Sequence, residues 1–254
     1  MRKLVLIFVV IACVSAATAF AAGGKDINSA PAVQFGAQQF GNTASDGGQR
    51  FNDCEDATSW WNMDVTAGDR ISIDLDAPLD HSLYVFPVGT TDFTVEETYS
   101  EGKEEAAQRN GRNGKARLVL TAGRSGTMPM VFQACNDNAA GPYSFTAHVQ
   151  HALVLAVPPM RRLRRNGTVT VGVRDAEGNP INSGVTALIE VRHDGKWGVV
   201  GAEAVQSGTA IVNVKIPRSF VGQRKRLRAA AGGPGYVTER SSTQRVEIRR
   251  ARRR

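Results

Sequence analysis

The chain has 254 residues, with 31 Lys and Arg against 24 Asp and Glu and a formal net charge of +7. Beyond residue 14, no apolar stretch approaches the roughly 20 residues that a membrane-spanning helix needs. The three Cys and four His form no C-x-x-C and no H-E-x-x-H, which excludes the common zinc-site patterns.

The N-terminus has the order of a secretory signal peptide. Arg2 and Lys3 precede an unbroken apolar run at residues 4–14, and small residues follow it. A positive start, a short apolar core and an A-x-A end are typical of such a signal. We therefore predict a signal peptide at residues 1–21 and a secreted or cell-envelope location.

The processing of this signal stays open. Cleavage after Ala19 and cleavage after Ala21 fit the A-x-A rule equally well. Residues 10–13 (V-I-A-C) also resemble a lipobox, which would place a lipid on Cys13.

Removal of the signal leaves two thiols, Cys54 and Cys135. In an oxidising compartment, the simplest interpretation is one disulfide. Closing a loop of about 80 residues would stabilise the fold by roughly 4 kcal/mol in the chain-entropy model.

The mature chain divides into parts of opposite charge. Residues 22–150 carry nine Lys/Arg and seventeen Asp/Glu, net −8, whereas residues 151–254 carry twenty and seven, net +13. The size suits two domains. We predict a flexible leader (22–49), an acidic β-sandwich domain (50–150), a basic immunoglobulin-like domain (151–249) and an arginine-rich tail (250–254).

Period-two alternation marks the strands of the first domain. Apolar residues alternate with polar ones at 61–65 and 70–76 around the turn at 66–69, which predicts a hairpin with a polar outer face. Residues 96–115 predict a long exposed loop with at most a helical turn. Further strands are expected at 82–87, 116–121, 128–135 and 143–149.

These residues carry a family resemblance. The run WWNMDVTAGDRISIDLDAPLDHSLYVF, together with the closing GPYSFTAHV, resembles the bacterial pre-peptidase C-terminal domain. The resemblance covers about residues 50–150 and implies a jelly-roll-like β-sandwich that accompanies secreted enzymes. No protease domain is found in this chain, so a role in protease maturation is not carried over.

The second domain repeats the alternation in about seven short strands between turn signals, which predicts an immunoglobulin-like sandwich. Asp194-Gly195 is a strong hairpin signal. The segment TVTVGVRDAEGNPINSGVTALIEVRHDGKWGVVG resembles bacterial Ig-like domains of extracellular proteins, a match that implies fold and not ligand. The predicted fold class is therefore all-β, with two sandwiches.

We find no catalytic constellation and predict a non-enzymatic protein without a cofactor. Asp74, Asp76 and Asp80 raise the alternative of a calcium site, since Ca²⁺ takes several oxygen ligands. Because no EF-hand spacing follows, a solvated acidic face explains these residues better.

Trp60 suggests a glycan site. If Trp61 faces the core, Trp60 points outward with Asn62 and Asp64, and an exposed ring beside amide and carboxylate groups suits a sugar. The interpretation that we favour is that a loop or the neighbouring domain covers Trp60.

Clusters of arginine in the basic domain predict attraction to polyanions. Nucleic acid is not the expected partner, because the chain is exported and no stacking aromatics interleave with the arginines. The predicted polyanion-binding residues are Arg161, Arg162, Arg164, Arg165, Arg249, Arg250, Arg252, Arg253 and Arg254.

The sequence thus predicts a secreted binding or adhesion module, held at the cell envelope partly by its basic domain. Its partners would be anionic envelope polymers or glycans, or another secreted protein. The alternatives are a glycan-binding protein acting through the first domain and an accessory or inhibitor subunit of a secreted hydrolase.

Overall fold

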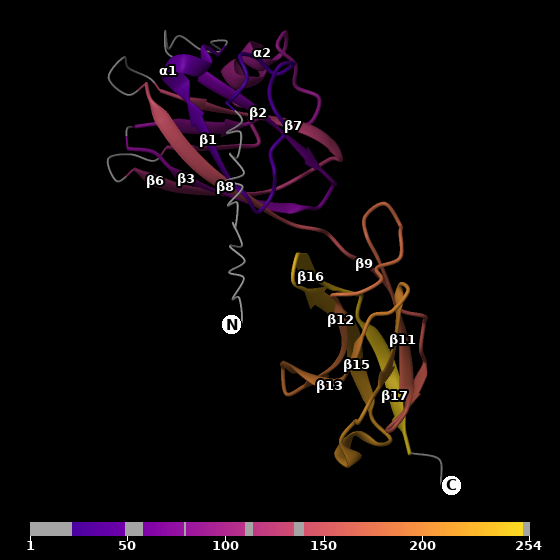
Figure 1. The fold of residues 1–254 in the computed structure, drawn as a ribbon. Helices are drawn as coiled ribbons and strands as arrows, with labels where there is room; N and C mark the ends of the chain where they lie inside the picture. The colour runs from indigo at the N-terminus through magenta and orange to yellow at the C-terminus, as the bar shows by residue number, and fades with distance from the viewer. Residues whose placement is uncertain (1–21, 49–57, 79, 110–113, 135–139, 251–254) are drawn as a thin grey trace, which may run out of the picture.

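The computed structural model describes residues 22–48, 58–78, 80–109, 114–134 and 140–250. Its strands form four sheets, two before residue 151 and two after it, and this confirms the predicted all-β sandwich fold (Figure 1). In this described part of the chain, no helix is long and apolar enough to span a membrane.

Two antiparallel four-stranded sheets build the first domain. Between them lies a core that includes Trp61, Met63, Ile73, Phe132 and Phe145. One sheet has the order β1 (Gln38–Asn42), β8 (Pro142–Gln150), β3 (Arg70–Asp76) and β6 (Lys115–Thr121); the other has β2 (Thr58–Val65), β7 (Gly126–Gln133), β4 (Ser82–Val85) and β5 (Ala106–Arg109).

The predicted hairpin of β2 and β3 is wrong, although both strands and the turn exist. The backbone N–H of Asp69 donates to the carbonyl of Thr66 at 3.0 Å, which closes the turn. However, β2 pairs with β7 and β3 pairs with β6 and β8, so the turn carries the chain from one sheet to the other. Alternation fixes which face of a strand is buried but not which strand lies beside it.

The predicted flexible leader is also wrong for its described part, residues 22–48. Gly24 exchanges two backbone hydrogen bonds with Trp60, and β1 pairs along its whole length with β8. Ile27 and Val33 supply the apolar side chains that bury this segment. The Gly-rich composition did not predict these contacts, because glycine lowers strand propensity. Tertiary contacts nevertheless stabilise the pairing.

A buried polar network fastens this segment to the sandwich. The Asp46 carboxylate, in the short helix α1 (Thr43–Asp46), accepts hydrogen bonds from the backbone N–H of Gly23 at 3.2 Å and the hydroxyl of Ser59 at 2.6 Å. Ser59 also hydrogen-bonds the hydroxyl of Tyr143, which accepts from the Trp61 indole N–H at 2.7 Å. Burial raises the pKa of the Tyr143 phenol above its ordinary value.

The predicted loop at 96–115 holds more structure than expected. Helix α2 (Val95–Ser100) contributes Val95 to a small apolar cluster with Trp60 and Phe86 on the outer side of the β2 sheet. Strand β5 then adds to β4 at the edge of that sheet. The charged residues of this segment did not predict either element, since both are short and Glu96 and Glu97 of the helix are exposed.

The second domain packs a larger sheet against a three-stranded one. Apolar positions alternate as predicted, for example Val169, Val171 and Val173, and Asp194-Gly195 forms the expected turn with positive φ at both residues. The larger sheet has the order β10 (Arg162–Arg164), β17 (Gln244–Arg249), β15 (Arg224–Gly233), β12 (Thr186–His193) and β13 (Lys196–Ala204), with β16 (Tyr236–Arg240) also beside β15; the smaller has β14 (Thr209–Asn213), β11 (Thr168–Arg174) and β9 (Val154–Ala156).

His151 joins the two domains. Its backbone N–H donates to the carbonyl of Gly235 at 2.8 Å, and its own carbonyl accepts from Val237 at 3.0 Å. The imidazole Nδ1 lies 3.3 Å from a carboxylate oxygen of Asp69, which also accepts from the backbone N–H of Ala152 at 3.2 Å. The junction is therefore hydrogen-bonded on both sides.

Candidate polyanion-binding surface

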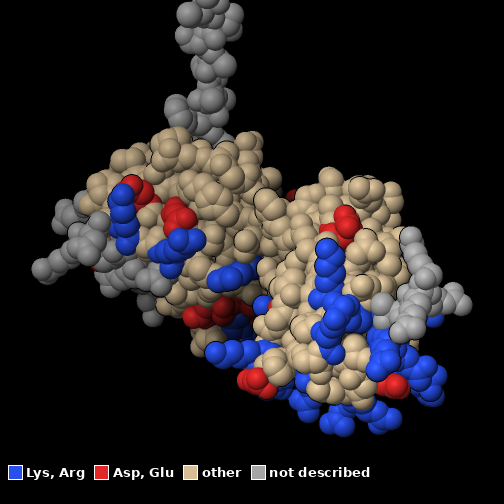
Figure 2. All heavy atoms as spheres, turned by 90° about the horizontal axis from the view of Figure 1, so that it is seen from below, with Lys and Arg blue, Asp and Glu red and all other residues tan. Residues whose placement is uncertain are grey.

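The outer face of the larger sheet of the second domain is covered with arginine. Strand alternation produces it: Leu227, Val246 and Ile248 point into the core, so the residues between them point outward. Figure 2 shows Lys and Arg side chains gathered over this domain, with few acidic residues among them. We call this surface the arginine face: Arg162, Arg164, Arg192, Arg224, Arg226, Arg228, Arg245 and Arg249.

Register places three of these arginines in one cross-strand row. Arg226 on β15 lies directly opposite Arg245 on β17. Val191 pairs with Leu227, so Arg192 follows at the level of Arg226, and its partner on β13 is Trp197. Adjacent strands are about 4.8 Å apart, which brings three positive charges within two strand spacings.

Such a row opposes folding. Directly opposed like charges destabilise a strand pair, by an amount within the 0.2–1 kcal/mol range of cross-strand interactions. All three arginines are exposed, so water and salt weaken the repulsion without removing it. A bound anion would convert this unfavourable arrangement into a favourable one.

Two glutamates neutralise arginines in the two rows that flank the row of Arg192, Arg226 and Arg245. Glu247 lies opposite Arg224 and contacts Arg162 at 3.6 Å and Arg249 at 3.3 Å. Glu190 accepts a hydrogen bond from Nε of Arg228 at 2.6 Å, in a pair that is mostly buried. The Arg228 guanidinium also lies over the Trp197 ring, 4.0 Å from its centroid, which holds it in place. The central row lacks such a glutamate in its register positions.

The arginines predicted from the sequence fall into four groups. Arg162, Arg164 and Arg249 belong to the arginine face. Arg161 and Arg250 are exposed outside its strands, whereas Arg165 donates from Nε to the carbonyl of Ile216 at 2.9 Å and is half-buried. Arg252, Arg253 and Arg254 lie outside the described residues.

The sequence interpretation missed five residues of the face because it searched for consecutive arginines. The available signal was their alternation: in Arg224-Lys225-Arg226-Leu227-Arg228, every second residue is arginine, at the start of a strand that the sequence predicts at 225–231. Period-two spacing puts these residues on one face. The missed residues are Arg192, Arg224, Arg226, Arg228 and Arg245.

The predicted glycan group of Trp60, Asn62 and Asp64 is not an exposed site. Trp60 does point away from the main core, but it is only 1% exposed beneath Ile27 and against Phe86, with ring centroids 6.0 Å apart. Asn62 donates from its amide to the carbonyl of Ile27 at 2.8 Å, and Asp64 accepts from the hydroxyl of Thr127 at 2.7 Å. The segment that precedes β1 covers the ring, so stacking on a sugar is excluded in this conformation.

The calcium candidates carry ion pairs. Asp74 lies 3.5 Å from Arg117, and Asp76 lies 3.4 Å from Lys115. Asp80 is half-buried after β3. Within the described ranges, no group of three His, Cys, Asp or Glu side chains is arranged to hold a metal ion. Cys54 and Cys135 both lie outside these ranges.

No protein-family model matches the chain, and no curated protein sequence matches it. Among solved structures, it is similar to PliG, a periplasmic inhibitor of g-type lysozyme from Aeromonas hydrophila, at 20% identity over 51% of this chain and 100% of that one, with a TM-score of 0.31. It is also similar to the adhesin domain of Epf from Streptococcus pyogenes, at 9% identity over 77% and 73%, with a TM-score of 0.33. TM-scores this low carry no inference about function.

Proposed function

We propose that this chain is an exported, non-enzymatic binding module that attaches to anionic polymers of the cell envelope through its arginine face. The observation that carries the proposal is the row of Arg192, Arg226 and Arg245, which adds like-charge repulsion to the fold and contributes no apolar burial. An anionic ligand lying across the strands would contact all three guanidinium groups, each of which can donate two parallel hydrogen bonds to a phosphate or carboxylate.

The charge of the whole domain supports the same conclusion. The net charge of +13 over residues 151–254 attracts a polyanion from a distance, whereas the −8 of residues 22–150 repels it. A polyanion therefore approaches one end of the molecule, and the acidic domain is held away from the surface.

The test is binding of the full mature chain to polyphosphate, used as a simple linear polyanion, at low and at physiological salt. Substitution of Arg192, Arg226 and Arg245 by Gln should weaken binding at low salt by tenfold or more, about 1.4 kcal/mol. The same variant should show a shallower decrease of affinity with salt, because fewer counterions are released.

A second variant controls for net charge. Arg174, Lys215 and Arg218 are exposed and lie outside the arginine face, and their substitution by Gln removes the same three charges. Equal weakening by the two triple variants would show that net charge and not the row governs binding. Absence of any binding at low salt would refute the proposal itself.

A further inference from the structure

The outer face of the other domain's β1 sheet carries a second ordered set of side chains. Register aligns them in two cross-strand rows, each with one residue from β1, β8, β3 and β6. The first row is Gln38, Thr146, Asp74 and Arg117, and the second is Phe40, Ser144, Asp76 and Lys115.

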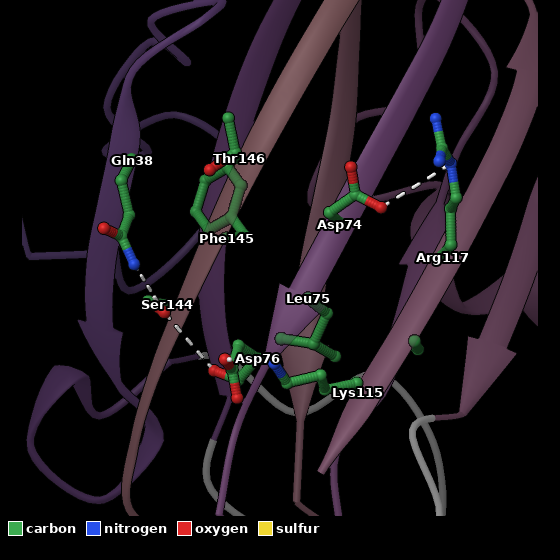
Figure 3. A pocket seen from close by; sticks show the side chains of 10 residues that line it. Gln38, Asp74, Leu75, Asp76, Lys115, Arg117, Ser144, Phe145 and Thr146 are labelled. Carbon is green, nitrogen blue, oxygen red and sulfur yellow. Dashed lines mark hydrogen bonds and ion pairs between the residues drawn. The ribbon is translucent and has the colours of Figure 1, made fainter. Parts of the chain in front are cut away.

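All members of these rows except Phe40 line a shallow groove of about 480 Å³ (Figure 3), and Phe40 lies beside it, opposite Ser144. The close-up shows Gln38 reaching toward Ser144 on one side and Arg117 reaching toward Asp74 on the other. The amide of Gln38 donates to the hydroxyl of Ser144 at 3.2 Å. A groove of this volume lies in the range of small-ligand sites, about 300–1,000 Å³.

The chemistry of the groove suits hydroxyl groups. Asp74 and Asp76 accept hydrogen bonds only, and Arg117 and Lys115 donate only, whereas a sugar hydroxyl does both. The two ion pairs in the groove are 3.5 and 3.4 Å long and largely exposed, with side-chain exposures between 46 and 76%. Exposed pairs of this kind contribute about 0–1 kcal/mol, so a ligand can replace their mutual contacts at little cost.

Charge and shape select among ligands that carry hydroxyls. The charges of the two acidic and two basic side chains cancel, and the domain around them is acidic. Repulsion from the domain therefore disfavours a polyanion in the groove but does not affect a neutral molecule. Phe40, at the β1 end of the second row, is 39% exposed and offers an apolar surface to the C–H face of a sugar ring.

We propose that this groove binds a short neutral oligosaccharide lying across the four strands. The row from Gln38 to Arg117 lies wholly in the groove and spans three strand spacings, about 14 Å, which makes room for a short chain and not only for a single small ion. The site lies on the opposite sheet from Trp60 and in the other domain from the arginine face, so it stands independently of polyanion binding.

The experiment screens the mature chain, with Arg192, Arg226 and Arg245 replaced by Gln, on an array of neutral and anionic oligosaccharides. This background weakens the arginine face, so that capture of neutral oligosaccharides reports the groove. We expect capture of neutral oligosaccharides, and calorimetry then measures Kd for the strongest of them. Capture of anionic oligosaccharides alone, or of none, would overturn the proposal.

Two groove variants and one control locate the site. Asp74→Asn with Arg117→Gln keeps the net charge and should weaken binding by tenfold or more, as should Phe40→Ala. Glu101→Gln with Lys103→Gln removes another exposed ion pair of the same domain and should leave Kd unchanged. Full binding by both groove variants refutes the assignment. If the double variant fails to fold, Phe40→Ala and chemical-shift mapping on the parent chain decide the question.

Discussion

Arg226 and Arg245 lie directly opposite each other on neighbouring strands of the second domain, with their side chains on the same exposed face. Replacing Arg226 by Thr removes this repulsion and should raise the free energy of unfolding by about 0.2–1 kcal/mol. The same change should weaken polyphosphate binding, since stability and function make opposite demands at this position. Urea unfolding and a binding isotherm measure the two effects.

Arg224→Thr is the matched control for this prediction. Arg224 is two residues away on the same strand and face, but its opposite residue is Glu247. Any gain in strand propensity from Thr is common to both variants. Arg226→Thr should therefore be the more stable of the two, and the reverse order would contradict the cross-strand interpretation.

Tyr143 predicts a specific alkaline sensitivity. Its pKa is raised in the folded state by burial, so the folded protein keeps the phenol neutral while the unfolded chain ionises it near pH 10. The stability that this group contributes is thus fully present below about pH 10 and decreases as pH rises further.

Tyr143→Phe separates this effect from other titrations. The variant leaves the Trp61 indole N–H without its acceptor, which should cost about 1–3 kcal/mol near neutral pH. Above about pH 10 the stability difference between the parent chain and the variant should shrink. Denaturant unfolding from pH 7 to 11 measures it, and a constant difference would contradict the assignment.

The Asp69 carboxylate should be important for the stability of the domain junction. It is 1% exposed and accepts hydrogen bonds from the backbone N–H groups of Thr66 at 3.0 Å and Ala152 at 3.2 Å. Asp69→Ala leaves both donors unsatisfied and should lower the free energy of unfolding by about 1.5–3 kcal/mol. Thermal and urea unfolding of the full chain measure the loss.

His151→Ala provides the comparison, because it removes only a half-exposed ring that contacts the same carboxylate at 3.3 Å. A loss below about 1 kcal/mol is expected. Small-angle scattering should show a wider spread of domain orientations for Asp69→Ala than for His151→Ala. Equal effects of the two substitutions would mean that the ring, and not the backbone contacts, stabilises the junction.

A disulfide between Cys54 and Cys135 remains a prediction, and the described strands support it. Thr58 and Gln133 are register partners on β2 and β7, and the two cysteines lie four residues before one and two residues after the other along the chain. Non-reducing peptide mapping of protein exported to an oxidising compartment should find the two peptides linked. Alkylation of both thiols in that protein would disprove the bond.

The sequence predicted well which face of each strand is buried, but it predicted poorly which strands lie side by side. Alternation correctly identified Ile71 and Ile73 as core residues, because burial depends on each strand's own pattern. It misassigned the neighbour of β3, since pairing depends on segments far along the chain. The alternating arginines of the arginine face were visible in the sequence, but its cross-strand row was not, since Arg245 and Arg226 become neighbours only through register.

Trp60 shows that side-chain direction and accessibility are predicted differently. Its outward direction from the main core was correctly inferred from alternation, and the favoured expectation of a covered ring is confirmed, but the sequence did not identify the covering segment. The Gly-rich segment before β1 covers it, and nothing local to Trp60 in sequence encodes that cover. Side-chain direction follows from local structure, whereas accessibility depends on the whole chain.

The pairing of β1 with β8 sets a schedule for folding. Gln38 lies opposite Thr146, more than a hundred residues later in the chain. At a synthesis rate of about 5–20 residues per second, β1 waits roughly 5–20 s for its partner strand. During that interval the apolar residues at the start of the domain lack their final cover. A chain with such long-range pairing folds slowly, on a scale of about milliseconds to seconds once its synthesis is complete. Until then, the unpaired edge of β1 must be protected from pairing with other strands or other chains.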